Sequence, residues 1–247
     1  MKAFVINLTR RADKREAILS EGEKHGIQLD VMEAVNGSLL SENELQNIVF
    51  DYPACTLTKG VVGCALSHLK IYKKIMDENI PIALVLEDDA ILHPALKTIL
   101  EKIELLNNGQ NPEVTLLSSH YYAPRVLRKL TDEYSIHEFL DGSLGHGYVL
   151  NAKAAESLYK NLMPVKWEAD KWYYFKQMGL VSVNCVVPHI IKAHGEASHS
   201  DLYAERILLK RKRRKYLNRR LVNVVKTRQR IKKILWKIFK RPFVKKS

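Results

Sequence analysis

No run of about eighteen apolar residues occurs in this 247-residue sequence, although a helix needs about 20 such residues to cross a bilayer. The apolar run at 3–8 is also too short for a signal peptide, and basic residues follow it at once. We therefore expect no membrane-spanning helix and no export. We accordingly expect the protein to work in the cytoplasm.

Cysteine is scarce. The three cysteines, Cys55, Cys64 and Cys185, have no CxxC spacing and offer too few ligands for a structural zinc site. They are typical of reduced, small apolar residues in a cytosolic protein, and a catalytic cysteine is disfavoured.

Acidic residues are missing from one part of the chain only. Of the 40 Lys and Arg residues, 19 lie in 206–247, which has no Asp or Glu. This leaves 21 basic against 27 acidic residues in 1–205, so the net charge of +13 comes from the tail. The sequence therefore predicts two parts, a mildly acidic body at 1–205 and a basic tail at 206–247.

Apolar runs rich in β-formers alternate with helical patterns along the body. We expect strands at 3–8, 28–35, 82–88, 113–119, 147–151 and 181–187. Helices are expected at 12–25, 64–79, 94–106 and 152–162, and a loop with a short helix at 38–60. This alternation indicates an α/β fold. Ligands bind such sheets at the carboxyl ends of the strands, which brings 7–11, 87–89 and 118–121 to one rim.

Three consecutive carboxylates, Glu87, Asp88 and Asp89, follow the strand at 82–88. Carboxylates this close are stable together only when they are solvated or neutralised by a cation. Glu87 and Asp89 point to the same side of an extended chain, and such hard oxygen ligands suit Mg²⁺ or Mn²⁺. The alternative is a solvated acidic turn before the helix that Pro94 begins. The position directly after a buried strand favours a metal site.

Five segments follow one another along the chain: FVINLTRRADKR, EAVNG, GVVGCALSHLKIYKKI, ALVLEDDAIL and GHGYVLNAKAAESL. In this order they resemble the lipooligosaccharide galactosyltransferases of glycosyltransferase family 25, which also includes collagen-modifying sugar transferases. The resemblance covers Lys2 to His199. It implies a GT-A type fold, a Rossmann-like mixed sheet with flanking helices. It also implies a UDP-sugar donor, most commonly with galactose, a divalent metal, and inversion at the anomeric carbon.

The resemblance also implies roles for acidic and histidine residues. The acidic motif of GT-A enzymes binds the metal on the donor diphosphate, and here it matches residues 87–89. Asp89 is the safer metal ligand, because the first position of the motif here is Glu87 and not Asp. In the alternative, Glu87 and Asp88 bind the donor by holding hydroxyl groups of its ribose or sugar. His194 resembles a late metal ligand of related enzymes. The alternative is a surface-loop histidine, with His189 and His199 nearby.

Donor-binding candidates follow the first strand. They are Asn7 at its end and Arg10, Arg11 and Arg15, because guanidinium groups bind phosphate in a two-pronged manner. The alternative for the arginines is a solvated helix start with Asp13 as a local partner. Asn36 is a further candidate, although an Asn-Gly turn needs no ligand to form.

Acceptor-binding and catalytic candidates lie later. His146, between two glycines, matches the acceptor-side loop of the family. In WEADKWYYF, Asp170 is the first candidate for the base that takes the acceptor proton and Glu168 the second, while Trp172 could stack on a sugar. The alternative is a helix start with a buried Trp172. His68 lies beside Ser67, and two interpretations stay open for it, contact with the donor or acceptor and simple packing. A hydrolase triad is disfavoured, because adjacent residues on a helix point in different directions.

The basic tail also has apolar residues at helical spacing, with Trp236 and Phe239 among them. An amphipathic helix of this kind lies on anionic lipid, which would bring the enzyme to a lipid-linked oligosaccharide acceptor at the inner membrane. Nucleic-acid binding is the alternative for the tail, and it is disfavoured because no base-stacking platform or reader motif accompanies the charge. A catalytically inactive sugar-binding protein of the same fold is the other alternative.

Overall fold

The computed structural model describes residues 1–118, 121–123, 125–142, 145–193, 203–217, 219, 234–235 and 238. The strands are β1 Lys2–Asn7, β2 Asp30–Glu33, β3 Ile82–Glu87, β4 Ala90–Leu92, β5 Glu113–Leu116, β6 Tyr121–Tyr122, β7 Val126–Lys129, β8 Ser135–Glu138, β9 Asp141–Gly142, β10 Gly147–Asn151, β11 Ser182–Val187 and β12 Ile191–Ala193. The helices are α1 Ala12–Lys24, η1 Gly37–Leu39, α2 Glu42–Ile48, α3 Lys59–Asp77, α4 Leu96–Leu106, α5 Ala152–Leu162, α6 Trp172–Gln177 and α7 Tyr203–Tyr216.

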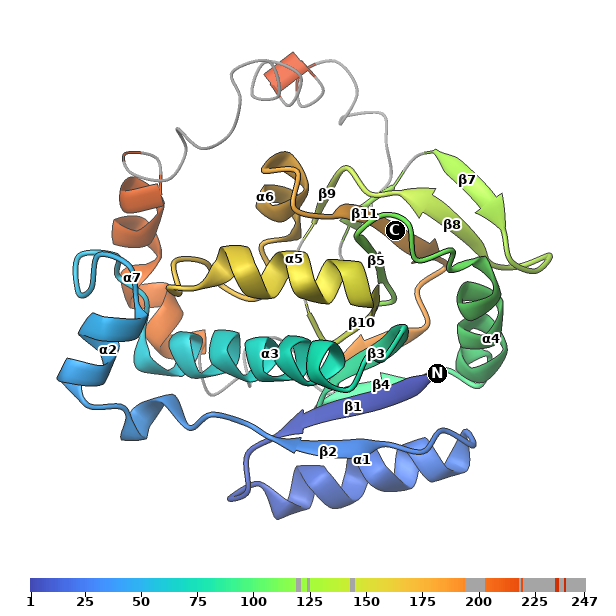
Figure 1. Ribbon diagram of the computed structural model, residues 1–247, viewed down its shortest axis with the longest axis horizontal. Helices are drawn as coiled ribbons and strands as arrows, with labels where there is room; N and C mark the ends of the chain where they lie inside the picture. The colour runs from blue at the N-terminus through green and yellow to red at the C-terminus, as the bar shows by residue number, and fades with distance from the viewer. Residues whose placement is uncertain are drawn as a thin grey trace.

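The main sheet has the strand order β2-β1-β3-β10-β5-β11-β8-β7 (Figure 1). Strands β2, β1 and β3 are mutually parallel, and so are β5 and β11. Strand β10 runs antiparallel between β3 and β5, and β8 is antiparallel to β11. Two pairs of short strands, β4 with β12 and β6 with β9, form separate small sheets.

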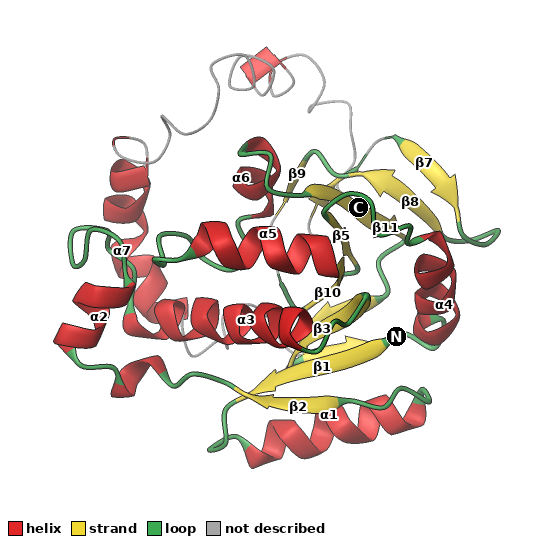
Figure 2. Ribbon diagram, in the orientation of Figure 1, coloured by secondary structure: helices red, strands yellow, loops and turns green. Residues whose placement is uncertain are grey.

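Helices cover both faces of the main sheet, which gives three layers (Figure 2). Alternate residues of β1 show this, because Phe4 packs into the core beneath α3, α5 and α6, while Val5 packs into the core beneath α1 and α4. Both side chains are fully buried. A strand that is buried on both faces needs a continuous apolar run, which is the pattern of β1 and β3.

Side-chain caps fix where the main helices begin. The Thr58 hydroxyl accepts a hydrogen bond from Val61 N at 3.3 Å at the start of α3, and Ser41 and Glu44 form a capping box on α2. Asn151 ends β10 and caps α5 by accepting from Ala154 N at 2.9 Å. These caps fix the first residues of α3 and α5.

The start of α3 packs directly on the turn after β2. Ser67 Oγ accepts a hydrogen bond from Val35 N at 2.8 Å. A Cβ added at Gly63 would lie 2.5 Å from Val35 O and 2.6 Å from Gly37 N. Only glycine therefore lets the helix and the turn approach this closely.

Gly63→Ala is expected to lower the free energy of unfolding by roughly 1–3 kcal/mol, because backbone must move to admit the methyl group. Urea denaturation followed by circular dichroism measures this. Lys70→Ala, an exposed change on the same helix, is the matched control and should stay within about 0.5 kcal/mol of the parent. Equal stability of the two variants would contradict the tight contact.

The predicted strands and helices of the body are present, and the α/β fold class is confirmed. The hairpin strands β6 to β9 at 121–142 and the short β4 and β12 were not predicted. Helix α7 crosses residue 206, the expected start of the tail, and its Arg213 is buried. Among the described helices, none is long and apolar enough to span a bilayer.

Candidate active site

The acidic turn lies at the centre of the sheet. Glu87 is the last residue of β3, which pairs with β1 on one side and β10 on the other. Asp88 and Asp89 form the turn that leads to β4, and Ala90 of β4 pairs with Ala193 of β12. The turn is therefore held between the main sheet and a small sheet.

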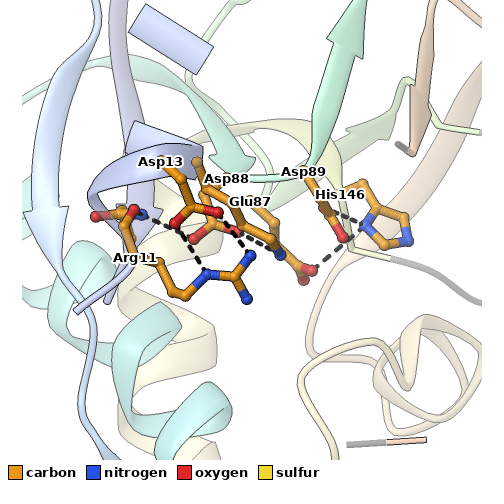
Figure 3. Close-up of polar contacts among 8 residues, drawn as sticks. Arg11, Asp13, Glu87, Asp88, Asp89 and His146 are labelled. Carbon is orange, nitrogen blue, oxygen red and sulfur yellow. Dashed lines mark hydrogen bonds and ion pairs between the residues drawn. The ribbon is translucent and has the colours of Figure 1, made fainter. Parts of the chain in front are cut away.

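Glu87, Asp89 and His146 bring their side chains together above this turn (Figure 3). His146 Nδ1 lies 3.0 Å from Asp89 Oδ1 and 3.4 Å from Glu87 Oε2. The backbone adds a contact, because Glu87 N donates to His146 O at 3.0 Å. One ligand atom from each of the three residues lies within 4.8 Å of the others.

Charges within this group shift the pKa values of its members in opposite directions. Burial would raise the pKa of Glu87, but His146 and His68 beside it outweigh burial and hold that pKa well below its usual range. Burial would lower the pKa of His146, but its hydrogen bonds to Asp89 and Glu87 raise it to about 10. The imidazolium thus supplies the positive charge that two adjacent carboxylates need.

The same residues fit a divalent metal. Two carboxylates and an imidazole are a donor set that Mn²⁺ accepts, and the short distances among their ligand atoms would let one ion contact all three. An ion would take the place of the proton on His146, because a histidine ligand must be neutral.

Binding of Mn²⁺ is therefore expected to release about one proton per ion near pH 7. The sign follows from the pKa of His146, about 10, since the ring keeps its proton below that pH. Apparent affinity should rise with pH up to about pH 10. Calorimetry in buffers of different ionisation enthalpy counts the protons, and His146→Asn should abolish the release. Proton-neutral binding by the parent protein would contradict this view of the site.

Asp88 points to different partners. Its Oδ2 accepts from Asn7 Nδ2 at 2.8 Å, and its Oδ1 lies 3.3 Å from Lys14 Nζ. Burial raises the pKa of Asp88, and the charge of Lys14 offsets part of that rise. The structure thus joins the end of β1, the start of α1 and the acidic turn at one rim. Lys14 was not among the residues predicted for this rim.

The three arginine candidates lie at the start of α1. Arg11 makes two hydrogen bonds to Asp13, at 3.0 and 2.9 Å, and the bond from Arg11 lowers the pKa of Asp13 to about 2. Arg10 and Arg15 are exposed. Asn36 caps η1, because its Oδ1 accepts from Ser38 N at 3.2 Å. These contacts are the local partners that the alternatives predicted, and they leave the donor-binding roles as proposals.

His68 reaches the acidic turn from α3. It is 2% exposed, and its Nε2 lies 3.5 Å from Glu87 Oε1. Its Nδ1 lies 2.7 Å from Tyr148 Oη, which in turn lies 2.8 Å from Tyr72 Oη. The backbone at Gly145 lies close to Glu87, since a Cβ added there would lie 3.2 Å from Glu87 Oε1. From the sequence, His68 was expected to contact donor or acceptor or simply to pack, and no pattern indicated its contact with Glu87.

Glu168 forms a buried ion pair with Arg213. Arg213 of α7 donates to both its oxygens, at 3.1 and 3.0 Å, and also to Cys55 O and Lys166 O at 2.7 and 2.8 Å. Burial opposes ionisation, but the charges of Lys171 and Arg213 lower the pKa of Glu168. A carboxylate saturated in this way is a poor base, so the structure gives Glu168 a structural role instead of the catalytic one considered for it.

Asp170 and Trp172 have different environments. Asp170 is half-buried, and its Oδ1 has no hydrogen-bond partner among the described residues. No hydrogen bond or ion pair joins it to Glu87, Asp89 or His146 in the part of the chain that is described. Trp172 is fully buried, edge-on to Tyr148 and Phe175. Its ring therefore belongs to the core and has no face open to an acceptor sugar, contrary to the stacking role expected for it.

His194, expected as a late metal ligand, lies outside the described residues, as does His199. The last described residue before it is Ala193, which pairs with Ala90. The described part of β12 thus ends beside the acidic turn.

This fold has a mixed sheet in which β10 runs antiparallel between the parallel strands β3 and β5, with an acidic turn at the end of β3. It defines a GT-A type domain. The sequence model for glycosyltransferase family 25 (LPS biosynthesis protein) matches residues 1–173. The chain belongs to glycosyltransferase family 25.

Curated relatives agree with this family. The chain is 32% identical over 174 residues to procollagen galactosyltransferase 2 of Homo sapiens, covering 63% of this chain and 26% of that protein. It is 27% identical over 180 residues to procollagen galactosyltransferase 1 of Danio rerio, covering 66% and 30%. Inactive glycosyltransferase 25 family member 3 of Homo sapiens is 34% identical over 110 residues, covering 41% and 18%. The chain thus spans less than a third of the length of these relatives.

Solved structures are more distant. A197 from STIV aligns with a TM-score of 0.43 and 9% identity, covering 79% of this chain and 86% of that one. The inositol-1-phosphate CTP transferase from T. maritima aligns with a TM-score of 0.38 and 13% identity, covering 85% and 96%. Likenesses at this level bear on neither substrate nor mechanism.

Proposed function

We propose that the protein is a metal-dependent, inverting glycosyltransferase that moves galactose from UDP-galactose onto a lipooligosaccharide or lipopolysaccharide acceptor at the cytoplasmic face of the inner membrane. The observation that carries the proposal is the convergence of Glu87, Asp89 and His146 at the end of a central strand. Galactose is the sugar in the names of two relatives, and the family description refers to lipopolysaccharide.

In this proposal Asp89, Glu87 and His146, with His194, hold Mn²⁺ or Mg²⁺. The ion, when bound, neutralises the charge that develops on the leaving diphosphate. Asn7 and Lys14 hold Asp88 at the rim, where it is available to a donor hydroxyl. In the same proposal Arg10, Arg11 and Arg15 offer guanidinium groups to the diphosphate, and Asn36 contacts the nucleotide.

The acceptor half of the mechanism rests on Asp170. Its Oδ1 is a buried acceptor without a partner among the described residues, which suits a group that takes a proton from a substrate hydroxyl. In our proposal that hydroxyl oxygen then attacks the anomeric carbon from the face opposite UDP, which inverts the configuration. His146, on the acceptor-side loop, would border the attacked carbon.

A panel of nucleotide sugars tests the proposal. Purified protein with Mn²⁺ is offered UDP-galactose, UDP-glucose and other donors, and release of free UDP is measured with and without an oligosaccharide acceptor. We expect turnover with UDP-galactose that chelation abolishes. Release of no nucleotide from any donor would overturn the proposal.

An inactive sugar-binding protein is the second candidate, because one relative is named as inactive. The same panel separates the two, since such a protein would bind UDP-galactose in calorimetry and release no UDP.

The tail supports the proposed membrane location. The described side chains of Lys210, Arg211, Lys212, Arg214 and Lys215 are exposed on α7, whereas Arg213 points into the body. Ile234, Leu235 and Ile238 are 56%, 49% and 58% exposed. Exposed cationic side chains on α7 and exposed apolar side chains at 234–238 both suit an anionic lipid surface.

Deletion of 218–247 is expected to weaken sedimentation with anionic vesicles strongly while soluble-acceptor activity remains. The deletion removes twelve Lys and Arg residues but keeps α7 and Arg213. Binding by the full chain should weaken as salt rises, because charges are screened over about 8 Å at physiological ionic strength. Sedimentation of the truncated chain as well as the full one would refute the membrane role. Salt-dependent retention on DNA, with no vesicle binding, would instead favour nucleic acid.

The residue at which the deletion begins decides whether the shortened chain is stable. Cutting at 206 would remove Arg213 and leave the buried Glu168 with only the longer 3.8 Å contact to Lys171, and breaking a buried pair in this way costs up to roughly 3–5 kcal/mol. A chain cut at 206 is therefore expected to be unstable, and it would be a misleading test of membrane binding.

A further inference from the structure

The inner side of Glu87 faces a second group of ligand atoms that the proposed transfer reaction does not use. Cys64 and His68 lie four residues apart on α3, so both project from one face of the helix toward the end of β3. One ligand atom each from Cys64, His68 and Glu87 lies within 4.8 Å of the others. The three cysteines of the chain are all described, and none is in a disulfide.

His68 supplies an independent sign of a ligand. Its ring is almost completely buried, and among the described residues its Nε2 has no hydrogen-bond partner within ordinary distance, although it lies 3.5 Å from Glu87 Oε1. A proton on Nε2 would face Glu87, whereas in the tautomer that donates Nδ1–H to Tyr148 Oη, Nε2 turns a lone pair toward the ionised carboxylate. Two acceptors facing each other in a buried place are unfavourable, and a cation between them removes the conflict.

The surroundings of His68 are those of a metal-bound histidine. Metal-ligating imidazoles typically engage a second group with their other ring nitrogen, which fixes the ring and its tautomer. Tyr148 Oη does this for His68 Nδ1 at 2.7 Å, and Tyr72 Oη in turn contacts Tyr148 Oη at 2.8 Å. The ring is thus held with Nε2 directed at Glu87.

We propose that Cys64, His68 and Glu87 form a second metal site, for a thiophilic divalent ion of the Zn²⁺ class. On binding, the Cys64 thiol loses its proton to solvent and its sulfur joins the ion, while His68 Nε2 and Glu87 Oε1 supply a nitrogen and an oxygen. A fourth position stays open to water, as in three-ligand zinc sites. Sulfur selects Zn²⁺ over Mn²⁺ and Mg²⁺, so the two sites prefer different ions.

Glu87 links the two sites. Its Oε1 faces His68 and its Oε2 faces His146, so one carboxylate would contact an ion on each side. An ion in the inner site would fix the orientation of Glu87 toward the outer one. This makes the inner ion a means of positioning a residue of the proposed transfer site, but its binding does not depend on transfer.

Cobalt(II) is the probe that tests the inner site. Added to the full-length, metal-free protein, Co²⁺ is expected to give a thiolate-to-cobalt charge-transfer band in the near ultraviolet. Cys64→Ser should lose the band. Asp89→Asn, which removes a ligand of the outer site only, should keep it. Absence of the band in the parent protein, or its persistence in Cys64→Ser, would overturn the proposal.

Alkylation of the parent protein gives a second readout that needs no variant. Iodoacetamide labelling followed by peptide mass spectrometry is expected to modify half-buried Cys64 at least tenfold more slowly with Zn²⁺ than with EDTA. Cys55 and Cys185 are fully buried and serve as internal references in the same sample. Equal labelling of Cys64 in both conditions would overturn the site. Neither readout depends on turnover, so failure of the proposed transfer would be recognised separately.

Discussion

Asp89→Asn is expected to reduce transfer from UDP-galactose by roughly 10³-fold, equivalent to about 4 kcal/mol of lost transition-state stabilisation. The amide keeps the size of the side chain but removes the charge that faces His146 and the proposed ion. Binding of UDP should lose its dependence on Mn²⁺. Initial rates with a soluble acceptor and calorimetry with UDP measure the two effects.

Asp132→Asn is the matched control, since Asp132 is exposed and remote from the acidic turn in sequence. It should leave both quantities unchanged. If Asp89→Asn retained the parent rate, the metal assignment at the end of β3 would be wrong.

Asp170→Asn is expected to lower the rate by about 10²-fold or more while UDP affinity stays at the parent value. The substitution is nearly isosteric, but an amide oxygen cannot accept the acceptor proton. Separate measurement of kcat and of UDP dissociation distinguishes loss of a base from loss of binding.

Glu168→Gln provides the contrast within the same segment. Its carboxylate binds Arg213 and not a substrate, so this variant should lose stability rather than rate at a temperature where it stays folded. A large loss of kcat in Glu168→Gln, with none in Asp170→Asn, would reverse the two roles.

The centre of the fold could be predicted from the sequence because strands there are buried on both faces and are therefore mostly apolar. β1 and β3 are such strands, and Gly26, with a positive φ of 65°, follows the end of α1 as expected of a glycine. Strands β7 and β8 were missed because their residues are exposed or half-buried, so no apolar run marks them.

The site could be predicted only where its residues are adjacent in sequence. Glu87, Asp88 and Asp89 form a visible cluster, but their partners come from distant segments. Lys14 reaches Asp88 across 74 positions, and a lysine in a basic stretch gives no sign of such a contact. Its neighbours Arg10, Arg11 and Arg15 were predicted instead, because arginine side chains commonly bind phosphate.

Burial was the second limit. The segment WEADKWYYF combines acids with aromatics, which is also the composition of a sugar-binding surface. Pattern alone could not show that Trp172 faces the core or that Glu168 meets Arg213, which lies 45 positions later. Such pairing depends on where α7 docks, and that is decided by tertiary packing.

The place of β10 in the sheet has a consequence for synthesis on the ribosome. β3 and β5 are made first, yet each needs β10 as its neighbour, and β10 ends only at residue 151. At 5–20 residues per second, β3 waits roughly 3–13 s for that strand after its own last residue has been added. During this interval its apolar edge can pair with other nascent chains. A chaperone that covers strand edges should therefore raise the yield of folded protein.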